Sequence, residues 1–152
     1  MREILFRGKR IDNGEWLDGH YHCTDYIMRG EEIRKHYILP QNAGDAYAVI
    51  PETVGQFTGL TDKNGKKIFE GDVIKFHKYR GEPDWVGVVK YEHCLFMVTG
   101  TMPLAYEKRI GEEPYFCPFE VQLSGIDKNT IEIIGSIHDS PELLRGEEDG
   151  SV

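Results

Sequence analysis

Residues 53–76 have the sequence TVGQFTGLTDKNGKKIFEGDVIKF and are the most regular part of the chain. Residues 53–58 alternate in hydrophobicity, as a strand with one buried face does. Residues 62–65 (DKNG) are typical of a hairpin turn, because Asp62 can hydrogen-bond its own turn and Gly65 can adopt the left-handed conformation. Residues 70–72 (EGD) form a second sharp turn before the strand that starts at Val73. The segment therefore predicts consecutive strands joined by tight turns.

A further hairpin is expected near the N-terminus. Asn13-Gly14 separates residues 4–11 from residues 15–21, and Asn-Gly allows the two successive positive φ angles of a tight hairpin. Residues 25–35 are polar and indicate no definite element, whereas residues 47–50 predict a short strand that Pro51 ends. Residues 1–51 are therefore expected to form an N-terminal β-hairpin lobe.

The second half of the chain continues the β pattern. Strands are expected at residues 85–91, 94–99, 119–123 and 130–134, and Ser140 followed by Pro141 predicts the start of a short helical turn. Residues 147–152 are expected to be a disordered acidic tail. We predict a mainly β protein in which residues 52–146 form a small SH3-like antiparallel barrel, because closing a sheet removes its exposed edges.

Composition narrows the functional classes. The chain has 152 residues, of which 39% are hydrophobic and 29% charged, and its net charge of −8 argues against a protein that coats nucleic acid. No apolar run reaches the roughly 20 residues of a membrane span, and the N-terminus does not resemble a signal peptide, so we expect a cytoplasmic protein. Cys23, Cys94 and Cys117 lack a paired spacing and are expected to be reduced, partly buried thiols.

Three segments resemble one known family. Residues 54–74 resemble the signature of the YopX family of phage and prophage proteins, residues 5–10 with Trp16 its opening, and residues 133–144 its closing segment. The resemblance leaves out residues 23–50 and 100–120. It implies a small β-rich protein encoded by a phage or prophage of a bacterial host, and it implies no activity and no catalytic or cofactor-binding residues.

One group of residues suggests a metal site. His20 and His22 would face the same side of a strand, which suits two imidazole ligands, and Cys23, Asp25 or His36 could complete the set. This interpretation would make the protein a metal-dependent enzyme. The alternative is a set of polar residues on an exposed strand and turn, and we favour it because no second paired-ligand motif is present.

Other catalytic patterns are weak. His93 and Cys94 are adjacent, as are His138 and Asp139, and neighbouring residues on a strand point to opposite faces. Glu70 and Asp72 are better explained by their turn than by acid–base chemistry. Phosphate-binding glycine motifs are missing. We therefore expect no enzyme activity and no cofactor.

A basic, aromatic segment indicates a possible nucleic-acid contact. Residues 63–90 contain seven basic and four acidic residues, with Phe76, Tyr79, Trp85 and Tyr91 near them. Such a surface suits single-stranded nucleic acid. The contact residues would be Lys66, Lys75, Lys78 and Arg80. The alternative is that the aromatic residues fill the core while the lysines protect strand edges.

Our leading hypothesis is a non-enzymatic accessory protein that acts through protein contacts. Aromatic residues are enriched at interfaces. The candidate interface residues are Tyr79, Trp85, Tyr106, Tyr115 and Phe116. The expected partner is a second copy of the chain, or a host or phage protein, with no membrane involved.

Overall fold

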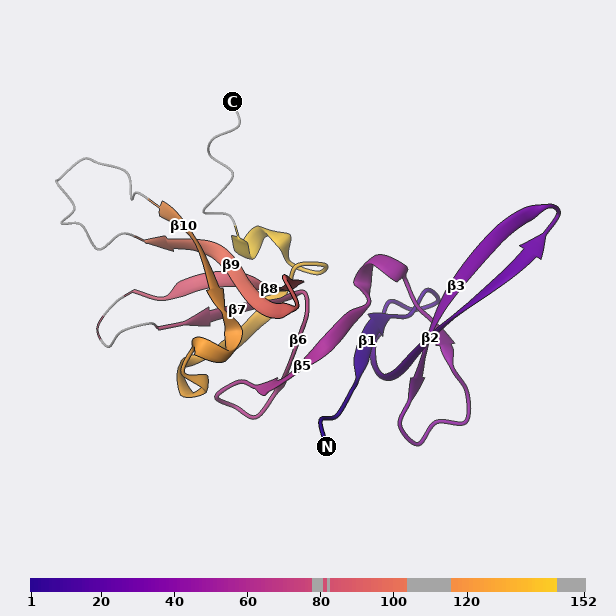
Figure 1. The fold of residues 1–152 in the computed structure, drawn as a ribbon, viewed down its shortest axis with the longest axis horizontal. Helices are drawn as coiled ribbons and strands as arrows, with labels where there is room; N and C mark the ends of the chain where they lie inside the picture. The colour runs from indigo at the N-terminus through magenta and orange to yellow at the C-terminus, as the bar shows by residue number, and fades with distance from the viewer. Residues whose placement is uncertain (78–80, 82, 104–115, 145–152) are drawn as a thin grey trace, which may run out of the picture. The chain divides into compact units, whose positions relative to one another are not determined.

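The computed structural model describes residues 1–77, 81, 83–103 and 116–144. It divides into two compact units, the first comprising Met1–Gly59 and the second beginning at Leu60 (Figure 1). The helices that the structure describes are 3-10 turns of three or four residues, so none of them could cross a bilayer.

The first unit is an antiparallel sheet with the strand order β4-β3-β2-β1-β5. Its elements are β1 (Phe6–Lys9), β2 (Trp16–Met28), β3 (Glu31–Pro40), β4 (Tyr47–Ala48), the 3-10 turn η1 (Pro51–Thr53) and β5 (Gly55–Thr61). Strands β1 and β2 confirm the predicted hairpin, and Gly14 has a φ of 72° and donates its N–H to the Arg10 carbonyl at 3.1 Å. The expected second positive φ angle, at Asn13, does not occur. Leu5, Ile38 and Val49 are buried in this unit.

Strands β2 and β3 are longer than their neighbours. β1 pairs with β2 only as far as Gly19, and β4 pairs with β3 only at Tyr37 and Ile38. The pairing of β2 with β3 continues to Met28, where Arg29 and Gly30 turn the chain with positive φ angles. Residues 20–28 and 31–36 are therefore a two-stranded ribbon, which Figure 1 shows in purple and which we call the β2–β3 ribbon.

The second unit contains a five-stranded antiparallel sheet with the order β10-β9-β8-β7-β11. Its elements are β6 (Lys67–Phe69), β7 (Asp72–Phe76), β8 (Trp85–Glu92), β9 (Leu95–Pro103), β10 (Phe116–Gln122), η2 (Leu123–Gly125), η3 (Lys128–Thr130), β11 (Glu132–Ser136) and η4 (Pro141–Leu144). Strand β6 returns from the turn that follows β5 and pairs with β5. The expectation of a mainly β chain is confirmed.

The predicted closed barrel is wrong. Closure requires a ladder between the first and last strands of a sheet, and in the residues described both β10 and β11 have a strand on one side only. The register of β11 against β7 also shifts between Ile133 and Gly135, which interrupts that ladder. Two open antiparallel sheets replace the expected SH3-like barrel. Near the C-terminus the chain forms the 3-10 turn η4, and the predicted tail of residues 147–152 lies outside the described part.

The core of the second unit is partly aromatic. Phe76, Trp85 and Phe119 contact one another with ring centroids 5.0–5.8 Å apart. Trp85 is only 7% exposed. It therefore fills the core and is not available as an interface residue, which corrects the prediction made for it.

Trp85→Ala is expected to lower the free energy of unfolding by about 3–5 kcal/mol, because it leaves a cavity beside two aromatic rings. The matched control is Tyr91→Ala, a residue of the same strand that is 50% exposed; it is expected to cost less than about 1 kcal/mol. Urea denaturation of both variants checks the difference. Equal losses would contradict the assignment of Trp85 to the core.

Two buried aspartates hold the turns of the central segment. The carboxylate of Asp62 accepts the backbone N–H groups of Asn64 and Lys66, both at 2.9 Å, and that of Ile133 at 3.2 Å. Asp72 accepts the N–H of Phe69 at 2.8 Å. The structural interpretation of the motif is confirmed for these two residues, because each satisfies backbone donors that its turn leaves without a ladder partner.

Asp62→Ala is expected to destabilise the protein by about 2–3 kcal/mol, because buried N–H groups lose a charged acceptor. Burial alone raises the pKa of the Asp62 carboxyl, but the hydrogen bonds from Lys66, Ile133 and Asn64 outweigh burial, so its pKa lies below the ordinary 3.8. The contribution of Asp62 is therefore present above that ordinary value and is lost as the pH falls below it.

Denaturation curves at several pH values measure this effect. The difference in the free energy of unfolding between the wild type and Asp62→Ala should be largest at neutral pH and should decrease in acid. Asp45→Ala, at an exposed aspartate, serves as the control and should change stability by less than about 0.5 kcal/mol. A gap that is the same at neutral and acid pH would contradict the role of the carboxylate.

Candidate functional site

The register of the β2–β3 ribbon assigns its side chains to two faces, because residues directly opposite in an antiparallel pair share a face. One face, which we call the aromatic face, carries from β2 and β3 the side chains of His20, His22, Thr24, Tyr26, Met28, Glu31, Ile33, Lys35, Tyr37 and Leu39. The opposite face carries Tyr21, Cys23, Asp25, Ile27, Glu32, Arg34, His36 and Ile38. Ile38 is buried, so the opposite face covers the core of the first unit at that end of the ribbon.

The aromatic face is held together by ring contacts. His22 stacks on Tyr37 with ring centroids 5.2 Å apart, and the Lys35 ammonium lies 5.6 Å from the centre of the Tyr26 ring. The Lys35 contact is the geometry of a cation–π interaction. His22 is exposed and Tyr26 is half-buried. The face therefore presents rings in fixed positions to solvent.

The opposite face is held by polar pairs. Arg34 donates two hydrogen bonds to Asp25, at 2.6 and 2.9 Å, and the Tyr21 hydroxyl lies 2.6 Å from His36 Nδ1. The Arg34 guanidinium holds the pKa of the Asp25 carboxyl below its ordinary value. Both partners of this ion pair are exposed, so it fixes the register of the ribbon more than it stabilises the fold.

The tip of the ribbon is apolar. Ile27 is 78% exposed and Met28 is 51% exposed, directly before the turn at Arg29 and Gly30. These side chains extend from a ribbon that is only two strands wide, so they are surrounded by water. The ribbon thus combines ordered rings along one face with unburied apolar groups at its end.

The predicted histidine site is only partly assembled. His20 and His22 do share a face, as expected. His36 lies opposite Cys23 on the other face, where it contacts Tyr21, so it cannot join the two as a ligand. His22 is stacked on Tyr37. The prediction of partly buried thiols is wrong for Cys23 and Cys94, which are exposed, and the side chain of Cys117 lies outside the described residues.

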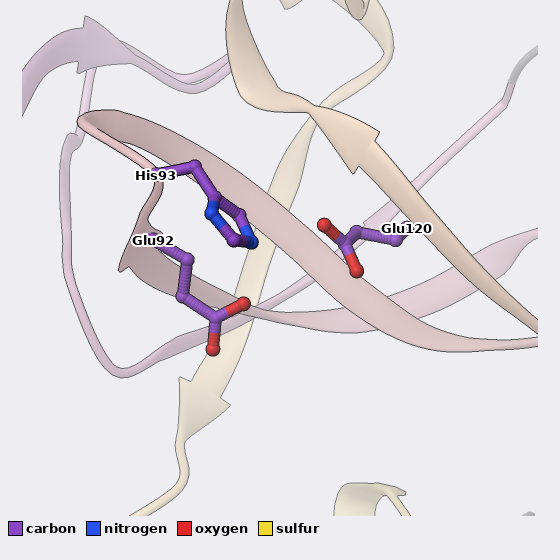
Figure 2. A group of neighbouring side chains, drawn as sticks. All are labelled: Glu92, His93 and Glu120. Carbon is purple, nitrogen blue, oxygen red and sulfur yellow. The ribbon is translucent and has the colours of Figure 1, made fainter.

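A different set of metal-ligating groups meets on the second unit. Glu92 ends β8, His93 follows it with a φ of 52°, and Glu120 lies in β10. The ladders through β9 place Glu92 and Glu120 on the same face of the sheet. Figure 2 shows the His93 ring beside both carboxylates, and the three ligand atoms lie within 4.8 Å of one another. Two ligands of one ion bound at about 2.0–2.2 Å lie at most about 4.4 Å apart, so these side chains would have to come closer together to hold one ion.

Two carboxylates and an imidazole suit zinc or manganese. His93 and Glu120 are exposed, however, and none of the three side chains makes a hydrogen bond or ion pair with the residues that the structure describes. Established metal sites orient their ligands with such contacts. Sequence reasoning missed Glu120, because the register that brings β10 beside the β8–β9 turn leaves no local signal.

The basic segment does not present its aromatic residues. Phe76 and Trp85 are in the core, and Lys75 lies 3.6 Å from the Glu132 carboxylate, which Lys63 also contacts. Lys66 is exposed on the turn after β5. Of the remaining predicted residues, Lys78, Tyr79, Arg80, Tyr106 and Tyr115 lie outside the described residues, and Phe116 begins β10 with its side chain outside them.

A hollow of about 150 Å³ lies in the second unit. Its lining residues are Phe76, His77, Val121, Gln122, Gly125, Ile126 and Asp127. His77 Nδ1 is 2.9 Å from the Asp84 carboxylate, and the Asp127 carboxylate accepts the Asn129 N–H at 3.0 Å. The titratable groups of this hollow therefore already have structural partners.

The chain is similar to a described protein family and to a solved structure. Among solved structures, the crystal structure of protein EF1440 from Enterococcus faecalis is similar, with 20% sequence identity and a TM-score of 0.48 over 95% of this chain and 100% of that chain. A comparison with curated proteins finds no match. The family model described as YopX protein matches residues 5–145, nearly the whole length. The chain therefore belongs to the YopX family.

Proposed function

We propose that this YopX-family chain is a phage- or prophage-encoded accessory protein that acts in the bacterial cytoplasm through protein contacts and not through catalysis. The observation that carries the proposal is the β2–β3 ribbon, whose aromatic face carries half-buried tyrosines and exposed histidines and whose tip residues Ile27 and Met28 are exposed. The contact surface is thus assigned to the ribbon and not to the aromatic residues of the second half of the chain.

Physical chemistry supports this assignment. A two-stranded ribbon is at best marginally stable in water, because it has no third strand and no hydrophobic layer to bury. The ribbon nevertheless keeps Tyr26, Met28 and Tyr37 on one face. Tyrosine and methionine are enriched where proteins bind one another, since they bury large areas. A partner that covers this face would remove its apolar groups from water.

The alternatives are less well supported. Nucleic-acid binding by residues 63–90 is less well supported because Phe76 and Trp85, two of the rings expected to stack on bases, lie in the core. In addition, Lys75 forms an ion pair with Glu132. Metal-dependent catalysis by His20 and His22 lacks the third ligand that His36 was expected to provide. The ribbon needs neither a cofactor nor a buried charge to act as a binding surface.

The proposal predicts that partner capture depends on the ribbon. Tyr26→Ser with Met28→Ser should reduce capture by a tagged full-length chain at least tenfold, because both side chains leave the aromatic face. Leu95→Ser, at an exposed leucine of the second unit, is the matched control and should leave capture unchanged. Quantitative mass spectrometry of proteins bound from host lysate, with untagged copies of the chain included, measures the ratio.

Circular dichroism should first show that each variant is folded. A tenfold loss with the ribbon variant and none with the Leu95 control supports the proposal. No capture by the wild type, or capture that the ribbon variant leaves intact, overturns it.

A further inference from the structure

The two edges of the β2–β3 ribbon differ in their pairing. Residues 20–28 of β2 pair with β3 on one side, and on the other side no ladder reaches them from the residues that the structure describes. Residues 1–6 line one hollow together with His20 and Tyr21, but the ladder between β1 and β2 ends at the pair of Phe6 and Gly19. On the outer side of β3, no ladder from the described residues reaches residues 31–35, because the chain beside β3 contacts it from His36 onward, where the His36 carbonyl accepts the Val49 N–H.

The two edges also differ in charge. On β3, four of residues 31–36 are charged, namely Glu31, Glu32, Arg34 and Lys35. On β2, residues 20–28 contain one acidic residue, Asp25, and no lysine, arginine or proline. Charged residues are a common protection of edge strands against pairing. The β3 edge has this protection and the β2 edge lacks it, so the ribbon is suited to accept another strand on the β2 side alone.

We propose that the strand accepted there is β2 of a second copy of this chain, paired antiparallel and centred on Thr24. The proposal rests on the proposed function, since it names the partner of the same ribbon. Two ribbons then form one four-stranded sheet with β3 of each copy outermost. A four-stranded sheet has the independent stability that a two-stranded ribbon lacks.

The register follows from symmetry. A two-fold axis perpendicular to the sheet places each residue opposite one of the same face. Thr24 is the middle of residues 20–28, so an axis at Thr24 pairs the whole free edge. Centring the pair on Asp25 sets two carboxylates opposite each other, whereas centring it on Cys23 leaves the tip residues Ile27 and Met28 without opposing residues.

The pairs formed around Thr24 are compatible. On the aromatic face, Thr24 meets Thr24 of the second copy and His22 meets Tyr26, whereas His20 meets Met28. On the opposite face, Cys23 meets Asp25 and Tyr21 meets Ile27. No like charges are opposed, and threonine pairs and aromatic pairs are among the favourable cross-strand contacts. The edge is therefore complementary to itself.

Disulfide trapping tests this register. Thr24→Cys, made with Cys23→Ser, Cys94→Ser and Cys117→Ser, should form a disulfide between two copies under mild oxidation, because opposed residues have Cα atoms about 4.5–5.5 Å apart. Lys35→Cys in the same background is the matched control, since Lys35 lies beside Thr24 on the outer strand. Cross-linking at position 24 should be at least tenfold faster than at position 35. Equal rates overturn the proposal.

Sedimentation equilibrium gives an independent measure. The wild type should dimerise, and Thr24→Lys should raise the dimer dissociation constant at least tenfold, because it opposes two ammonium groups. Lys66→Glu, at an exposed lysine outside the ribbon, should leave the constant unchanged. A wild type that stays monomeric at every concentration tested overturns self-pairing. If capture from lysate then still depends on Tyr26 and Met28, the proposed function stands with another partner; if it does not, both proposals fail.

Discussion

The relative lengths of neighbouring strands are the constraint on which the first unit depends. A backbone N–H or C=O group needs a partner in the next strand or must be left to water. β2 has 13 residues and β1 has 4, so β1 can satisfy only one end of β2. Everything unusual about the unit follows from this mismatch: the two-stranded ribbon, the exposed aromatic face, the apolar tip and the open backbone edge.

In the second unit, polar side chains accept hydrogen bonds from backbone groups that have no partner in a neighbouring strand. Asp62 binds backbone groups both within its own turn and at Ile133 in β11, which lies 71 residues further on. A turn between two strands is thereby joined to a strand formed much later in the chain. Asp62 and Asp72 of the family signature accept hydrogen bonds from backbone N–H groups, so these residues of the long motif have a structural role.

Much of the local structure was predictable, because tight turns require particular residues that can be recognised in the sequence. Gly14 and Gly65 have the positive φ angles expected at their turns, whereas Asn13 does not have the positive φ expected of it. The ribbon was not predictable for a physical reason. Hydrophobic alternation marks a strand with one face in the core, but both faces of residues 20–28 meet solvent over most of their length. Its turn at Arg29 and Gly30 also lacks the asparagine or aspartate that identifies a hairpin.

The predictions of candidate sites were wrong where the strand register decides which side chains share a face. His36 and His22 are separated by one step of the ladder, and that step places them on opposite faces. Glu120 joins Glu92 and His93 only because β9 aligns β10 with the end of β8. Trp85 looked like an interface residue because aromatic content says nothing of burial, whereas the ring lies between Phe76 and Phe119.

The charged outer edge of β3 has one more consequence. Sheets that add strands through a bare edge usually leave a new bare edge behind, and growth of that kind leads to fibrils. Here the ribbon has Glu31, Glu32, Arg34 and Lys35 along its far side. Strand pairing that begins at β2 therefore ends after one copy is added, and the unprotected β2 edge does not lead to fibril growth.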